Sequence, residues 1–97
     1  MLISAPMGLN DIVTIKMVGG DEVIGKLLDE NINNHVELGK PLVVMMAQQG
    51  FGLAPYILTA NPDSSVKLDS RHIISVVKTF DAVAKQYIKQ TSNIIVP

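Results

Sequence analysis

The sequence predicts a mainly β fold, a small and strongly bent five-stranded barrel followed by one C-terminal helix. Short segments with alternating apolar residues recur at hairpin spacing, and turns rich in glycine and asparagine separate them. Helical periodicity is confined to residues 81–90. The 97 residues are expected to form one domain, with an arm at 1–11, the barrel at 12–78, the helix at 81–90 and a tail at 91–97.

The first predicted hairpin spans residues 12–28. Val13 and Ile15 alternate with polar side chains in its first strand, which predicts that one face of the strand is buried. The sequence Gly-Gly-Asp at 19–21 predicts a tight turn before the second strand. Gly25 lies inside that second strand, where a glycine usually marks a bend or the close approach of another backbone.

Four further extended segments and a helix complete the predicted fold. A polar turn leads to the longest strand, in which Gly39 and Pro41 predict a bend. The segment at 72–78 is apolar on both faces, which is typical of a strand buried on both sides. Asp81 is the predicted N-cap of the helix. The extended segments are predicted at residues 36–46, 51–59, 66–68 and 72–78.

Composition and charge exclude several classes of protein. The chain has Cys 0, which excludes disulfides and thiolate metal sites. Its first residues lack a basic leader, and no apolar run approaches the roughly 20 residues of a membrane span, so we expect a cytoplasmic protein without membrane contact. The net charge is −1, so nucleic-acid binding would require a local patch or a patch repeated around an oligomer.

The sequence contains no recognisable catalytic or metal-binding pattern. It has no cysteine nucleophile, no His-Glu-x-x-His motif and no phosphate-binding loop. Its two histidines, His35 and His72, lie far apart in the chain and have no matching pattern of acidic ligands. We therefore expect a binding protein rather than an enzyme, with no catalytic residue, no metal and no cofactor.

The glycine spacing resembles the first motif of the Sm and LSm (Sm-like) family. Gly20 follows an alternating strand, Gly25 comes five residues later, and Leu27 comes two residues after Gly25. With a shortened turn, the family's next positions (Asp, apolar, Asn, apolar) correspond to Asp29, Ile32, Asn33 and Val36. Counted without a gap, the same positions fall on Asn31, Asn34, His35 and Leu38. The resemblance implies a divergent member of the family with an Sm-like, SH3-like barrel.

The family's second motif corresponds to the sequence from Leu68 to Ile73. In this chain Asp69 and Ser70 stand where the family has Arg and Gly, although Arg71 is adjacent. The family usually has a helix before the barrel, whereas the predicted helix of this chain follows it. The resemblance covers residues 12–78 by the order of their segments.

The resemblance also implies where a ligand would bind. Family members bind single-stranded RNA at the mouth of a ring, against the turn after the second strand and the turn before the fifth. Asparagine amides can bond to base edges, and histidine or arginine can stack on a base. The nucleic-acid-binding residues expected from these two turns are Asn31, Asn33, Asn34, His35, Arg71 and His72.

Each of these residues also has a purely structural interpretation. Asparagines are common turn formers because they tolerate a left-handed backbone. The two histidines fit ordinary positions at the surface or at strand ends. Arg71 fits a solvated ion pair with Asp69. The sequence leaves these interpretations open.

The apolar segment at 72–78 further predicts self-association. At an exposed edge such a strand would promote aggregation, whereas pairing with a strand of a neighbouring copy would cover it. Head-to-tail pairing closes into a ring when the rotation between copies allows, and the resemblance implies about five to seven subunits. The alternative is that the C-terminal helix covers this edge in a monomer or dimer.

The predicted function is that of a ring-forming, non-catalytic Sm-like module that binds single-stranded nucleic acid. RNA is the expected ligand in preference to DNA. The alternative is a protein-interaction or structural scaffold with the same small barrel and no nucleic-acid role, which the net charge of −1 favours.

Overall fold

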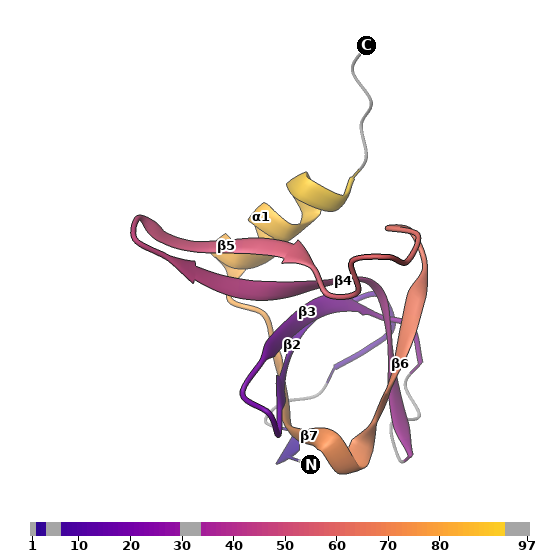
Figure 1. Cartoon of the computed structure of the whole chain (residues 1–97). Coiled ribbons are helices and arrows are strands. Elements are labelled where there is room, and N and C mark those ends of the chain that lie inside the picture. The colour runs from indigo at the N-terminus through magenta and orange to yellow at the C-terminus, as the bar shows by residue number, and fades with distance from the viewer. Residues whose placement is uncertain (1, 4–6, 30–33, 93–97) are drawn as a thin grey trace.

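The structure is a computed structural model that describes residues 2–3, 7–29 and 34–92. Figure 1 shows a mainly β chain with one C-terminal helix. A short 3-10 helix, η1 (Ser70–His72), precedes the last strand, and α1 (Asp81–Thr91) follows that strand. The strands are β1 (Leu2–Ile3), β2 (Ile12–Met17), β3 (Glu22–Leu27), β4 (His35–Ala47), β5 (Gly50–Pro55), β6 (Ser65–Asp69) and β7 (Ile73–Lys78). Among the described residues, no helix has the length and apolar character needed to cross a membrane.

The sheet has seven strands and is not closed into a barrel, so the predicted five-stranded closed barrel is wrong in its backbone pairing. The strand order is β1-β7-β2-β3-β4-β5, and β6 pairs with β4 off this path. All these pairs are antiparallel except β1 with β7. The first part of β4 pairs with β6 and the second part with β5, so the β4–β5 hairpin extends away from the other strands (Figure 1).

The bend of β4 depends on a close contact with β3. The β3–β4 register shifts between Ile24 and Lys26, on either side of Gly25. A Cβ at Gly25 would lie 2.9 Å from Leu38 Cβ and 3.1 Å from the Gly39 carbonyl oxygen. The prediction that Gly25 marks a close backbone approach is confirmed. Lys40 then has a φ of +49°, a left-handed conformation that redirects the strand.

The larger of two apolar clusters forms the interior of the curved sheet. The alternation predicted for the first strand is confirmed, because Val13 and Ile15 are fully buried whereas Thr14 and Lys16 are partly exposed. Residues from β2, β3, β4, β6 and β7 meet in this cluster, so strands that do not pair still share one interior. Its buried members are Val13, Ile15, Val23, Leu27, Val36, Leu38, Leu68, Ile73 and Val76.

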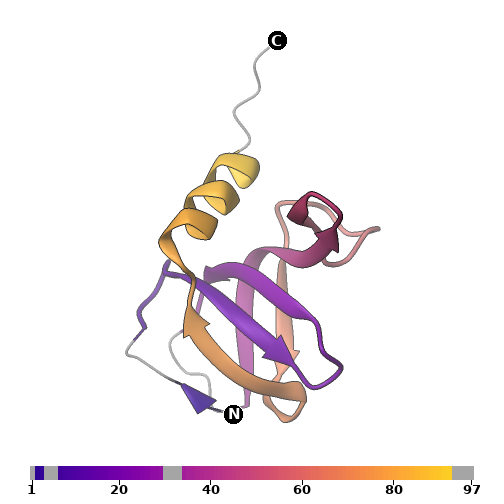
Figure 2. The ribbon, with the colours of Figure 1, turned by 90° about the vertical axis from the view of Figure 1, so that its left-hand side faces the viewer.

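The helix α1 packs on the β3–β4 side of the sheet, at the end opposite η1 (Figures 1 and 2). Tyr87 is buried in a second cluster with Ile24 and Leu42. Its hydroxyl lies 2.9 Å from both the Gly39 and the Lys40 carbonyl oxygens, to which it can donate. This bond therefore fixes the helix to the bend of β4.

The helix occupies the predicted segment, but its predicted cap is wrong. Phe80 is the N-cap residue, and no side chain caps the helix. Asp81 is instead the first helical residue, where a carboxylate still interacts favourably with the helix dipole. The reason is that the non-helical backbone of a cap position occurs at Phe80, with a φ of −56° and a ψ of 137°, so the helix begins one residue earlier than a cap at Asp81 would require.

The apolar strand β7 is buried less completely than the sequence predicts. Ile73 and Val76 are buried, whereas Ile74 is 47% exposed. One edge of β7 pairs with β2, and β1 pairs with Ser75 and Val76 at the other edge. The first described residues thus cover part of the edge for which we predicted either a sister copy or the helix. His72, which the sequence predicts to begin this strand, belongs to η1.

Candidate nucleic-acid interface

The turn before β4 and the turn before β7 lie side by side. The antiparallel β4–β6 pairing places His35 directly opposite Asp69. One step further, the Ser70 N–H donates to the Asn34 carbonyl at 3.1 Å. Asn34, His35, Arg71 and His72 therefore come from two adjoining turns although their sequence positions are far apart. We call residues 34–35 and 69–72 the joined turns.

The geometry of η1 is set by Asp69. Its carboxylate accepts hydrogen bonds from the Arg71 backbone N–H at 2.9 Å and from the guanidinium Nη2 at 2.7 Å. These bonds hold the pKa of the Asp69 carboxyl well below its usual range, and the same contact raises the pKa of Arg71. The Arg71 side chain is nevertheless 85% exposed, so one face of its guanidinium remains open to a planar ligand.

The two histidines have different surroundings. His72 is exposed, and its backbone carbonyl accepts a hydrogen bond from the Val18 N–H at 2.8 Å, which ties η1 to the β2–β3 turn. His35 is half-buried, and its Nε2 lies 3.9 Å from Asp29 Oδ2. His72 can therefore reach a ligand freely, whereas His35 can do so only from beside an acidic group.

Not all predicted binding residues can be placed. Asn31 and Asn33 lie outside the described residues. Asn34 is exposed at the end of this turn. The structure thus brings together Asn34, His35, Arg71 and His72, and it confirms the ion pair between Arg71 and Asp69 that the sequence left as an alternative.

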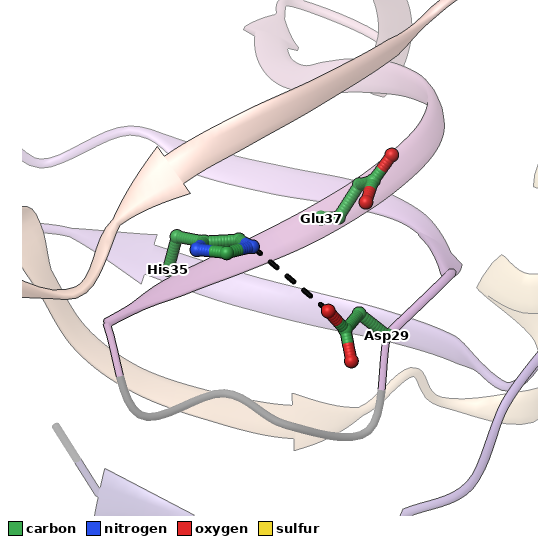
Figure 3. A group of neighbouring side chains, drawn as sticks. All are labelled: Asp29, His35 and Glu37. Carbon is green, nitrogen blue, oxygen red and sulfur yellow. Dashed lines mark ion pairs between the residues drawn. The ribbon is translucent and has the colours of Figure 1, made fainter.

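Acidic groups that the sequence did not suggest surround His35. Figure 3 shows the Asp29 carboxylate and the His35 imidazole pointing toward each other, with Glu37 further along the same strand. The ligand atoms of these three residues all lie within 4.8 Å of one another. The spacing of His35 and Glu37 is a sequence signal, since residues two apart in a strand share a face. Asp29 joins them only through the fold of the turn.

The charges near the joined turns are mostly negative. Asp29, Glu37 and Asp69 contribute three carboxylates, whereas the cations are Arg71, which is already paired with Asp69, and Lys67, which lies opposite Glu37. Phosphate groups would be repelled by this arrangement unless a cation intervenes. Contacts to bases therefore fit the joined turns better than contacts to a phosphate backbone.

No protein-family model and no curated protein matches the chain. The functional assignment therefore depends on the joined turns and on the edges of the sheet.

Proposed function

We propose that the chain is a divergent Sm-like module that self-associates and binds single-stranded nucleic acid at the joined turns, without catalysis. The observation that carries the proposal is the hydrogen bond from Ser70 N–H to the Asn34 carbonyl, beside the His35–Asp69 pair. Two turns that the family uses for RNA thereby form one surface. RNA is the proposed ligand in preference to DNA.

The order of the strands supports an opened version of the Sm-like barrel. The two-glycine hairpin β2–β3, the bent strand β4 and the return of β7 to β2 follow the expected order. β5 and β6 pair with successive parts of β4, as one long strand would, and residues 56–64 interrupt them. The shared core of β2, β3, β4, β6 and β7 supports a barrel-like interior without a closed backbone ladder.

The binding chemistry we propose is base stacking with amide contacts to base edges. The exposed His72 ring and the exposed guanidinium face of Arg71 offer flat surfaces, and Asn34 offers a donor and an acceptor. Stacking contributes about 1–3 kcal/mol per base. Because phosphates contribute little, binding should depend only weakly on salt.

Fluorescence anisotropy with labelled oligo-U and oligo-A strands tests this interface. His72→Ala is expected to weaken binding about 5- to 100-fold, because it removes one stacking surface. Lys85→Ala, on the exposed side of α1, is the control and should bind as wild type. Absence of wild-type binding at tens of micromolar protein, or equal weakening by both variants, would contradict the proposal.

We propose self-association because the two edges of the sheet are formed by different strands. One end is β5 and the other is β1 with β7, so head-to-tail pairing would join two different edges. The Tyr56 N–H donates to the Pro41 carbonyl, and hydrogen-bonded pairs alternate along an antiparallel ladder. The backbone groups of Phe51 and Leu53 therefore face away from β4. One of these backbone groups, the Leu53 carbonyl oxygen, accepts a hydrogen bond from the Gln90 side-chain amide at 2.9 Å.

Apolar side chains lie beside the β5 edge. Met46 is 81% exposed, and it lines a hollow of about 290 Å³ with Phe51, Phe80 and Val83. A second copy of the chain is the occupant that we propose, because it would supply both a strand for the β5 edge and apolar surface for the hollow. The resulting ring would hold about five to seven copies, by resemblance to the family.

Light scattering is expected to give a mass several times the 10.5 kDa of one chain. Phe51→Lys should shift the protein toward the monomer, since a charge on an edge strand opposes strand pairing. Leu58→Lys is the matched control, because Leu58 is 82% exposed in the 56–64 segment away from the β5 edge. A monomeric wild-type protein, or dissociation by both variants, would rule out this interface.

A protein-interaction or structural scaffold remains the second candidate function. The observation that favours it is the excess of carboxylates around the joined turns, which opposes nucleic acid. The anisotropy measurement distinguishes the two, because a scaffold would form the oligomer and leave every labelled strand unbound.

A further inference from the structure

We infer that Asp29, His35 and Glu37 bind one divalent first-row metal ion, for which Zn²⁺ is the probe. Asp29 follows β3, whereas His35 and Glu37 lie on β4, so the pairing of β3 with β4 brings the three side chains together. Their ligand atoms lie within 4.8 Å of one another, and all three residues are half-buried (Figure 3). This inference goes beyond the proposed function and does not depend on it.

The distances between the ligand atoms of these three residues fit a shared metal ion better than direct hydrogen bonds. The 3.9 Å between His35 Nε2 and Asp29 Oδ2 is too long for a hydrogen bond between these atoms. Two ligand atoms bound at about 2.1 Å to a tetrahedral ion lie roughly 3.4 Å apart. Small rotations of side chains that are already partly exposed would close this difference. The remaining coordination positions would be filled by water.

Charge and ligand type indicate which ion binds. Two carboxylates balance the charge of a divalent cation, and one imidazole gives the set the mixed nitrogen and oxygen character that Zn²⁺ accepts. Mg²⁺ and Ca²⁺ prefer oxygen ligands alone. Copper(I) prefers thiolate or thioether ligands, and these three residues offer neither. The usual order of metal affinities places Zn²⁺ above Mn²⁺ and below Cu²⁺ at equal geometry, so Zn²⁺ serves as the probe of a divalent first-row metal site.

A neighbouring hydrogen bond orients one of the ligands. The Ser65 hydroxyl lies 3.0 Å from Glu37 Oε2 and donates to it across the β4–β6 pair. Bonds of this kind fix the direction of a ligating carboxylate. Lys67 lies opposite Glu37 in the register, but no ion pair joins them among the described residues. The Glu37 carboxylate is therefore not held in an ion pair by this ammonium group.

Isothermal titration calorimetry of the full, metal-free chain with zinc chloride tests the site. Wild type is expected to bind one Zn²⁺ per chain, and His35→Ala and Glu37→Gln should each weaken binding at least about 10-fold. His72→Ala is the matched control, because His72 is the other of the two histidines, and it should bind as wild type.

Two further measurements keep this test decisive. Far-UV circular dichroism shows whether each variant is folded, and Glu37→Gln is the more conservative change because its amide oxygen can still accept from Ser65. Zn²⁺ should also broaden or shift the ring signals of His35 and leave those of His72 unchanged in NMR spectra. Absence of Zn²⁺ binding, tighter binding of Mg²⁺, or equal losses in His35→Ala and His72→Ala would overturn the inference. None of these measurements involves nucleic acid.

Discussion

Replacing Tyr87 with alanine is expected to lower the free energy of unfolding by about 3–5 kcal/mol, as for other buried aromatic side chains. Tyr87 is 2% exposed and packs with Ile24 and Leu42, so its removal leaves a cavity between α1 and the sheet. The variant also loses the hydroxyl that bonds to the carbonyls at the bend of β4. Urea denaturation followed by circular dichroism measures the change.

Two other variants separate the contributions of Tyr87. Tyr87→Phe keeps the packing and loses the hydroxyl, which should cost about 1–3 kcal/mol because buried carbonyls lose their donor. Ile88→Ala is the control, because Ile88 is 52% exposed on the same helix. Similar losses in Tyr87→Ala and Ile88→Ala would show that the helix is not anchored by Tyr87.

The same tyrosine predicts how stability falls at high pH. Burial raises the pKa of Tyr87 to about 12, above the roughly 10 of an unfolded tyrosine. Its contribution is therefore fully present below pH 10 and is lost as the pH rises through 12. Tyr87→Phe should lack this part of the alkaline loss.

Gly25→Val is expected to destabilise the protein by at least the roughly 1–3 kcal/mol typical of an overpacked core. Even the first added carbon would lie 2.9 Å from Leu38 Cβ and 3.1 Å from the Gly39 carbonyl oxygen. The β3 and β4 backbones would have to separate at the bend, which would also disturb the contact of Tyr87 with Gly39. Thermal or urea denaturation gives the size of the loss.

Gly52→Val is the matched control for Gly25. Gly52 is also a strand glycine, in β5, but a Cβ there would meet no atom within 4 Å. Valine favours extended structure, so this variant should be as stable as wild type or slightly more stable. If both valines destabilised the protein equally, the loss would come from strand glycines in general and not from the β3–β4 contact.

Most of the strands could be predicted because their pattern is local. Val13 and Ile15 alternate with polar residues, and both are fully buried in β2. The glycine inside β3 could be interpreted in the same way, since only a bend or a close neighbour explains its position. The helix was also predictable from the spacing of its apolar residues, although Phe80 rather than Asp81 is its cap.

The features that could not be predicted depend on distant parts of the chain. β1 is two residues long, too short for any periodicity, and it forms only through its pairing with β7. The opened sheet depends on residues 56–64, which separate β5 from β6 where the two strands pair with successive parts of β4. Asp29 approaches His35 only once the β3–β4 turn is folded, so spacing alone gave no sign of a ligand set. Local patterns do not link Asn34 to Ser70, so the contact between the joined turns could not be predicted from spacing.

The loop at residues 56–64, between β5 and β6, is expected to tolerate inserted sequence. Pro55 keeps its place opposite Leu42, and Ser65 keeps its place opposite Gly39, so each strand is held by its own part of β4. The length of the intervening loop is therefore not fixed by the ladder. A peptide epitope or a fluorescent reporter grafted beside the exposed Leu58 would lengthen the loop and leave both registers unchanged.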